Sequence, residues 1–169
     1  MSRPKQKREP VHEGLLVRLA ILAEAETIST VIREAFLPFE AEYTGDAFGY
    51  TTPPTNEILP RFDEGPIWIA EIDGEPVGTV SGMRDGERFY IRSMAIKPSV
   101  QRVGVGQKLL DALEAYAREK GFEKLYLYTT HVLRGAKRLY EKNGFYVLRE
   151  TGPEEWFDMG GLEMEKKLN

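Results

Sequence analysis

The chain has 169 residues, of which 41% are hydrophobic and 30% charged, and its formal net charge is −4 at pH 7. This length suits one globular domain, and the absence of cysteine excludes disulfides, thiolate nucleophiles and cysteine metal sites. With only two histidines we expect no metal site, and no apolar run approaches the roughly 18 residues that a membrane helix needs.

The first twelve residues predict a flexible basic arm, followed by a single domain at residues 13–169. The opening MSRPKQKR carries four positive charges, and no apolar signal-peptide core follows it, so we expect a cytoplasmic location. Without those four charges, the net charge of −4 becomes about −8 for residues 9–169. Nucleic-acid binding by this acidic domain is therefore not expected.

The N-terminal part predicts a strand, a helix and an irregular segment. Residues 15–20 form the strand, and apolar residues then recur at helical spacing up to Phe36, before Pro38. Residues 37–56 mix aromatic, acidic, glycine and proline residues without a clean period. A short helix is expected within residues 55–62, despite its internal proline.

Three strands are predicted next, at residues 66–72, 76–83 and 88–96. The dipeptide Asp73-Gly74 is a strong signal for a two-residue hairpin turn between the first two. The turn sequence RDGE leads into the third.

Helices and strands alternate in the remainder of the chain. From Val105 the apolar period is helical, and Gly121 is a natural end for that helix. A strand, a helix and two further strands follow, at residues 124–130, 134–143, 145–150 and 162–168. The predicted order is β, α, α, β, β, β, α, β, α, β, β.

Two glycines, Gly104 and Gly106, separate a strand from the long helix within QRVGVG. Such a turn lets backbone N–H groups converge on a phosphate at the helix N-terminus, although glycines also permit a merely tight connection. A Walker A loop does not fit, because Lys108 follows Gln107 and precedes Leu109. A dinucleotide-binding loop would need a glycine at position 109.

Gln101, Gly104 and Gly106 match the pattern Q/R-x-x-G-x-G/A at the start of a long helix. Here the chain resembles the GNAT superfamily of acetyl-coenzyme A-dependent N-acetyltransferases. The later GAKRLYEKNGF resembles the family's A-x-x-L-Y-x-x-x-G-F segment, and the likeness covers roughly residues 15–168. It implies an α/β (α+β) fold, with a mixed central sheet of about six to seven strands, splayed at its centre and flanked by about four helices.

The resemblance implies acetyl-coenzyme A as the cosubstrate. In the family, the free edge of the central strand holds the pantetheine arm, which corresponds here to Met94, Ala95 and Ile96. Backbone amides of the glycine loop face the pyrophosphate, and the Arg102 guanidinium adds charge. The loop positions implied to bind the coenzyme are Gln101, Arg102, Val103, Gly104, Val105, Gly106 and Gln107.

The helix after the fifth strand supplies the implied catalytic residue. Leu133, Ala136 and Tyr140 are spaced i, i+3 and i+7, so they share one helix face and are all implied to contact the coenzyme. The family's tyrosine at the Tyr140 position can protonate the departing thiolate as a general acid. A buried structural tyrosine is the alternative. Many members have Asn at the Leu133 position, and leucine cannot supply that amide hydrogen bond.

The general base is not assigned by the resemblance. Many members place a Glu on the central strand where YIRSM has Arg92 and Ser93. Ser93 acting through an ordered water is one candidate, and Glu71 and His131 on neighbouring strands are others. For His131, a merely exposed loop histidine is the alternative.

The acceptor is expected to bind over the irregular segment, because variable loops on a rigid scaffold carry selectivity. Phe39, Glu42 and Tyr43 are the candidate substrate-binding residues there, together with Glu71 and His131. Aromatic walls with negative charge suit a cationic amine, although an ordinary lid over the core is the alternative. The acidic aromatic patch PEEWFD borders either the acceptor site or a dimer interface.

The sequence therefore predicts an N-acetyltransferase that moves an acetyl group from acetyl-coenzyme A to a primary amine of a small molecule or peptide. Direct attack in a ternary complex is expected, because no cysteine is present to carry a covalent intermediate. A non-catalytic acyl-coenzyme A-binding or sensing module is the first alternative, and a strictly protein-directed enzyme is the second. A homodimer is compatible with the sequence.

Overall fold

The computed structural model describes residues 13–101 and 103–168; the predicted basic arm and Arg102 lie outside them. The described residues include a seven-stranded mixed sheet in the order β1-β2-β3-β4-β5-β7-β6. Its strands are β1 (Leu15–Leu19), β2 (Ile67–Ile72), β3 (Glu75–Asp85), β4 (Arg88–Ile96), β5 (Lys124–Thr130), β6 (Tyr146–Thr151) and β7 (Gly161–Lys167). The longer helices are α1 (Ala25–Phe36), α2 (Gly45–Thr51), α5 (Val105–Glu119) and α6 (Arg134–Lys142). Two single turns are α3 (Thr55–Ile58) and α4 (Arg61–Glu64).

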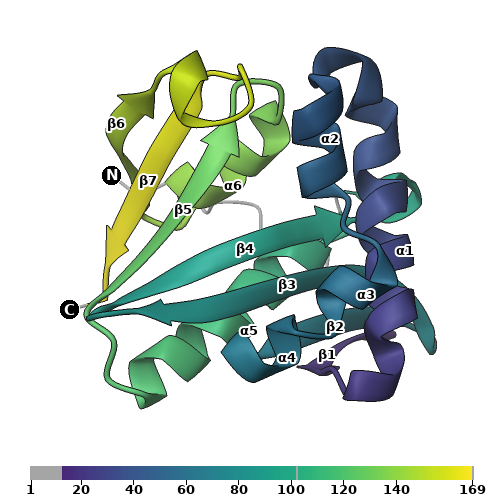
Figure 1. Ribbon diagram of the computed structural model, residues 1–169. Helices are drawn as coiled ribbons and strands as arrows, with labels where there is room; N and C mark the ends of the chain where they lie inside the picture. Colours follow the sequence, from purple (N-terminus) through teal and green to yellow (C-terminus); the bar gives the residue numbers. More distant parts are fainter. Residues whose placement is uncertain (1–12, 102, 169) are drawn as a thin grey trace, which may run out of the picture.

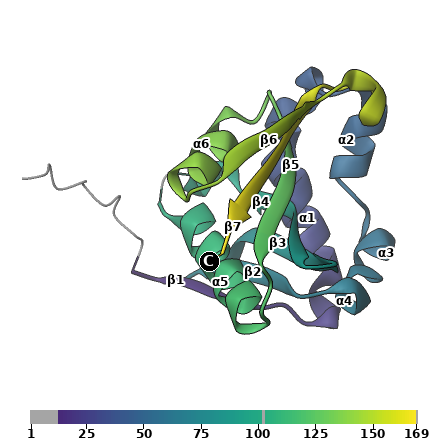
Figure 2. The same cartoon turned by 90° about the vertical axis from the view of Figure 1, so that its left-hand side faces the viewer.

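Helices cover both faces of the sheet. Figure 2 shows α5 and α6 on one face, and α1 to α4 on the other. The apolar faces of α5 and α1 each build a core on their own side of the sheet, with Leu109 and Leu113 in the first and Ile28 and Ile32 in the second. Within the described part of the chain, no helix is long and apolar enough to cross a membrane.

The parallel strands β4 and β5 separate along their length (Figure 1). Only the segments 88–90 and 124–126 pair, so the ladder between the two strands ends before the second half of β4. On the side that faces β5, the backbone of residues 91–96 therefore has no strand partner among the described residues. This is the splay at the centre of the sheet that the family resemblance implies.

A bulge interrupts β4 at Ser93. Phe89 and Ile91 lie in the core beneath α5, whereas Ala95 lies in the core beneath α1. Strict alternation would put all three on one face, but an extra residue shifts the register with β3, and Ser93 adopts a φ of 56°. The sequence analysis did not predict this bulge, because a serine with left-handed backbone leaves no sequence signal.

The segment between α1 and β2 is more helical than expected. Residues 45–51 form α2, where Thr44 caps the helix by accepting a hydrogen bond at Oγ1 from the Ala47 N–H at 3.2 Å. The helix expected within residues 55–62 is divided into α3 and α4, because Pro60 interrupts it.

Candidate functional site

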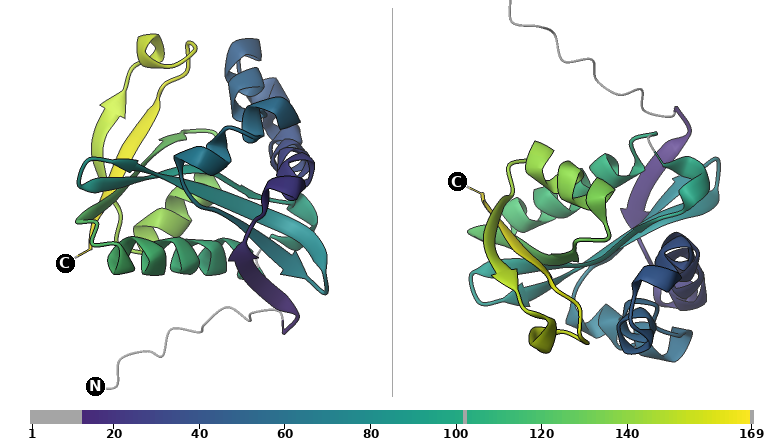
Figure 3. Two further views of the ribbon diagram at one scale, coloured as in Figure 1. Left: turned by 60° about the horizontal axis from the view of Figure 1, so that its bottom comes forward. Right: turned by 90° about the horizontal axis from the view of Figure 1, so that it is seen from above.

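A cavity of about 370 Å³ opens where β4 and β5 diverge. Figure 3 shows the surrounding elements, with β6 and β7 on one side of the opening and α1 and α2 on the other. The lining comes mainly from β4, β5, α6 and the segments around α2 and before β7. It includes Tyr43, Tyr50, Arg61, Tyr90, Arg92, Ser93, Met94, Thr129, Leu133, Ala136, Tyr140, Arg149, Glu155 and Trp156.

The N-terminus of α5 leaves backbone donors free. Gly104 is the N-cap, with a φ of 86°, and as a glycine it has no side chain with which to cap the helix. The first bond back into the helix runs from Lys108 N to Gly104 O at 3.1 Å. The N–H groups of Val105, Gly106 and Gln107 therefore lack partners inside the helix, and the helix dipole adds partial positive charge there. These donors form an arrangement that can bind a phosphate.

Gly106 also allows three elements to approach closely. A Cβ at this position would lie 2.9 Å from Ile96 Cδ1 on β4 and 3.0 Å from Leu139 Cδ2 on α6. A side chain at this position would therefore require the ends of the Ile96 and Leu139 side chains to shift. The two glycines thus have separate roles, because Gly104 supplies the left-handed backbone and Gly106 the close contact.

Tyr140 is buried on α6, with 4% of its surface exposed, and it lines the cavity. Its ring packs on that of Phe145, with centroids 5.4 Å apart. Burial, and then the neighbouring Tyr90, raise the pKa of the Tyr140 hydroxyl. The phenol is therefore protonated at neutral pH, which is the state required of a proton donor. Leu133 and Ala136 line the same cavity.

Of the predicted acceptor residues, Tyr43 lines the cavity and the other four do not. Phe39 packs against the core on the α1 side, and Glu42 is exposed. Glu71 accepts a hydrogen bond at Oε1 from Arg18 Nε at 2.8 Å, and it lies on β2, which β3 separates from β4. His131 is exposed in the turn after β5. The structure thus brings neither Glu71 nor His131 to the cavity as a base.

The Ser93 hydroxyl accepts a hydrogen bond from an arginine that the sequence did not predict to be near it. Arg61 Nη1 donates a hydrogen bond to Ser93 Oγ at 2.8 Å, which ties α4 to the bulge in β4. Sequence analysis missed Arg61, because it stands in a single-turn helix after a proline and belongs to no recognisable pattern. Within the described part of the chain, the charged residues that line the cavity are Arg61, Arg92, Arg149 and Glu155, so the negative charge expected from Glu42 is not part of its wall.

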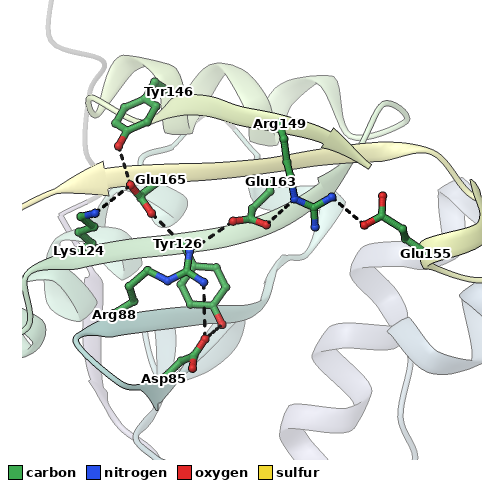
Figure 4. A network of polar contacts seen from close by, with 9 residues as sticks. All are labelled: Asp85, Arg88, Lys124, Tyr126, Tyr146, Arg149, Glu155, Glu163 and Glu165. Atoms are coloured by element: carbon green, nitrogen blue, oxygen red, sulfur yellow. Dashed lines mark hydrogen bonds and ion pairs between the residues drawn. The ribbon is translucent and has the colours of Figure 1, made fainter. Parts of the chain in front are cut away.

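Arg149, which lines the cavity, belongs to a network of polar contacts on the sheet (Figure 4). Arg149 lies between Glu155 and Glu163, with nitrogen–oxygen distances of 2.7 Å and 3.1 Å. Further along β7, burial opposes ionisation of Glu165, but Tyr146 and Lys124 contribute to holding its pKa below the usual value. These partnered charges form a rigid surface rather than a set of free groups. The described residues include no group of three or more histidine or acidic side chains arranged to hold a metal ion.

Residues 30–145 match the model of the acetyltransferase (GNAT) family. The chain belongs to this family. The resemblance inferred from the glycine loop and the GAKRLYEKNGF segment is confirmed.

Individual GNAT relatives agree with this assignment. The chain is 32% identical over 152 residues to the uncharacterized N-acetyltransferase YjgM of Escherichia coli, a match that covers 81% of this chain and 87% of that protein. It is also 32% identical over 82 residues to the probable N-acetyltransferase camello of Xenopus tropicalis. That match covers 47% of this chain and 37% of the Xenopus protein, so the chain corresponds to only part of it.

Solved GNAT structures share the fold. The PaiA N-acetyltransferase of Thermoplasma acidophilum, crystallised with coenzyme A, aligns with a TM-score of 0.74 at 21% identity and covers 90% of this chain and 98% of its own. YncA of Salmonella typhimurium, crystallised with acetyl-coenzyme A, also gives a TM-score of 0.74 at 21% identity, covering 93% of this chain and 95% of its own. The predicted GNAT fold is therefore confirmed.

Proposed function

We propose that the protein transfers an acetyl group from acetyl-coenzyme A to a primary amine by direct attack in a ternary complex. One observation carries this proposal. The unpaired half of β4, the face of α6 with Tyr140 and the segments that would enclose an acceptor all line the same cavity. Family membership supports acetyl transfer in general, and two structural relatives were crystallised with coenzyme A or acetyl-coenzyme A.

The coenzyme would be held at two places. The N–H groups of residues 105–107 would bind the pyrophosphate, which is supported by their lack of partners inside α5. The open edge of β4 at Met94 and Ile96 would pair with the amide groups of the pantetheine arm, as an added strand would. A role for Arg102 stays a prediction, because it lies outside the described residues.

When bound, acetyl-coenzyme A supplies an acyl thioester that an uncharged amine can attack. The amine nitrogen forms the new C–N bond, the C–S bond breaks, and the sulfur leaves with the electron pair. Tyr140 would donate a proton to that sulfur, a role supported by its place in the cavity. The only carboxylate that lines the cavity within the described residues, Glu155, is paired with Arg149. The amine would therefore enter uncharged, and after its attack the nitrogen would lose one proton to water near Ser93. A proton from water would then restore the Tyr140 hydroxyl.

The test is a screen of amine classes with free-thiol detection, run in parallel on the wild-type protein and Tyr140→Phe, with calorimetry of acetyl-coenzyme A binding. We expect turnover on at least one class of amine, and its loss in the variant with coenzyme affinity retained. Coenzyme binding without turnover on any amine would instead identify a sensing module. The absence of coenzyme binding would reject both functions.

A further inference from the structure

The cavity carries more positive than negative charge. Its charged lining residues are Arg61, Arg92, Arg149 and Glu155. Arg149 is already paired with Glu155 and with Glu163. Arg92 is likewise paired, with Glu64, so among the described residues Arg61 is the charged lining residue without an ion pair. The two arginines are near enough to each other for their charges to interact.

In the described part of the chain, Arg61 forms no ion pair of its own, because Glu64, the carboxylate whose charge acts on it, is paired with Arg92. Within the described residues its hydrogen bond is the one that it donates to the neutral hydroxyl of Ser93. Burial, and then the positive charge of Arg92, lower the pKa of Arg61, so its surroundings disfavour the cation. An arginine nevertheless stays protonated in proteins. A partly buried charge of this kind destabilises the fold unless an anion joins it.

The guanidinium of Arg92 has N–H groups for which the described residues supply no acceptor. Its Nη2 donates to Glu64 at 2.5 Å, and only 17% of the side chain is exposed. Its Nε is buried and has no hydrogen-bond acceptor among the described residues. Because this atom is buried, it does not face the cavity, and a ligand would instead use Nη1, for which no acceptor is present among the described residues.

The anion would not come from the coenzyme phosphates. Those phosphates are assigned to the N-terminus of α5, and α4, which carries Arg61, lies on the opposite face of the sheet (Figure 2). A negative group near Arg61 must then belong to the other substrate. Tyr50, Tyr90 and Trp156 line the same cavity and would contact the uncharged part of that molecule.

We propose that the acceptor is a small amine that also carries a carboxylate, such as an amino acid, and that Arg61 and Arg92 bind this carboxylate. The inference rests on the proposed acetyl transfer and names the substrate class. A guanidinium presents a planar fork of donors that matches the two oxygens of a carboxylate, and Arg61 and Arg92 both have donors available.

The test compares amino acids with their carboxamides, which lack only the negative charge. With acetyl-coenzyme A saturating, kcat/KM is measured for each acid and its amide in the wild-type protein, Arg61→Gln and Arg61→Lys. The acid-to-amide ratio is then compared between variants, so differences in amine basicity cancel. We expect Arg61→Gln to lower the ratio on the order of 10- to 100-fold, and Arg61→Lys to lower it less.

A purely structural Arg61 would give a different result. If it only secures the bulge through Ser93, Arg61→Gln lowers kcat/KM for acids and amides by the same factor and leaves the ratio unchanged, which overturns the inference. Arg149→Lys is the control, because this arginine lines the cavity but is already paired, and lysine keeps the charge that balances Glu155. Its acid-to-amide ratio should equal that of the wild-type protein.

Two further outcomes are decisive. If peptides with an acidic first residue are acetylated more efficiently than any free amino acid, the carboxylate belongs to a protein substrate and the small-molecule assignment is wrong. If no amine is acetylated, the proposed function fails, and calorimetry of amino acids and amides with coenzyme-loaded protein decides the inference. A preference for acids that disappears in Arg61→Gln supports the carboxylate site, and equal binding rejects it.

Discussion

The side-chain amides of Gln107 and Asn143 donate hydrogen bonds to each other, with Nε2–Oδ1 at 2.8 Å and Nδ2–Oε1 at 2.9 Å. Gln107 lies in the first turn of α5, and Asn143 is the C-cap of α6. The pair therefore joins the helix that would bind phosphate to the helix that carries Tyr140. The distance between α5 and α6 therefore depends in part on the uncharged side chains of Gln107 and Asn143.

Asn143→Ala should lower the free energy of unfolding by about 1 kcal/mol and raise KM for acetyl-coenzyme A, because it frees the start of α5 from α6. Asp111→Ala is the control, since it removes the other acceptor of Gln107 without affecting α6. Denaturant unfolding and steady-state kinetics measure both effects. Equal changes in KM for the two variants would contradict the coupling.

Gly104→Ala should weaken acetyl-coenzyme A binding, because alanine resists the φ of 86° that aligns the first N–H groups of α5. Gly121→Ala is a matched control at the far end of the helix, where φ is 80° and no ligand is expected. Both variants should lose about 1–2 kcal/mol of stability. Calorimetry should find reduced coenzyme affinity in Gly104→Ala alone.

Tyr140→Phe should lower kcat by about 10² to 10⁴ while the unfolding free energy changes little, because the hydroxyl has no hydrogen-bond partner among the described residues. Tyr126→Phe should behave in the opposite way. Its hydroxyl donates to Asp85 Oδ2 at 2.5 Å and lies outside the cavity lining, so stability falls and kcat is retained. Comparable kcat in the two variants would remove Tyr140 from the mechanism.

Acid should weaken the attachment of β1 to α1. A hydrogen bond from Arg18 lowers the pKa of Glu24 from 4.5 to about 2. Because the folded-state pKa is the lower one, ionised Glu24 stabilises the fold above pH 4.5, and this contribution is lost as the pH falls toward 2. Glu24→Gln should therefore be less stable than wild type at neutral pH and equal to it below about pH 2.

Urea unfolding at several pH values measures this difference. The effect should be small and should shrink with added salt, since Arg18 is partly exposed. Glu57→Gln is the control, because Glu57 is exposed and forms no ion pair within the described residues. A pH-independent deficit in Glu24→Gln would show that packing, rather than charge, is responsible.

The sequence predicted the elements with strong periodicity. The Asp73-Gly74 turn joins β2 and β3 as expected. The helices α5 and α6 begin at the predicted residues, Val105 and Arg134. These signals are local, because a glycine turn and an apolar helix face are both encoded by neighbouring residues. The helix α2 was missed, since its two glycines lower helix propensity and only Ala47 and Phe48 in it are buried.

The acceptor side of the cavity could not be predicted in the same way. Arg61 reaches Ser93, the residue after Arg92, only because the chain turns after Pro60 and a bulge reorients β4 at Ser93. Contacts of this kind join residues about thirty positions apart and depend on tertiary packing. The family pattern identified the coenzyme side because its glycines have a fixed spacing, whereas no spacing rule applies to Arg61.

The divergence of β4 and β5 also bears on how the protein avoids aggregation. An unpaired strand edge at the rim of a sheet can recruit a strand from another molecule. Here the unpaired length of β4 lies inside the sheet, between β3 and the departing β5, with helices on both faces. A neighbouring protein cannot align a strand along it without displacing β5, whereas a thin flexible chain can. The fold thus leaves the unpaired backbone of β4 accessible to a narrow, flexible ligand but not to a strand of another protein.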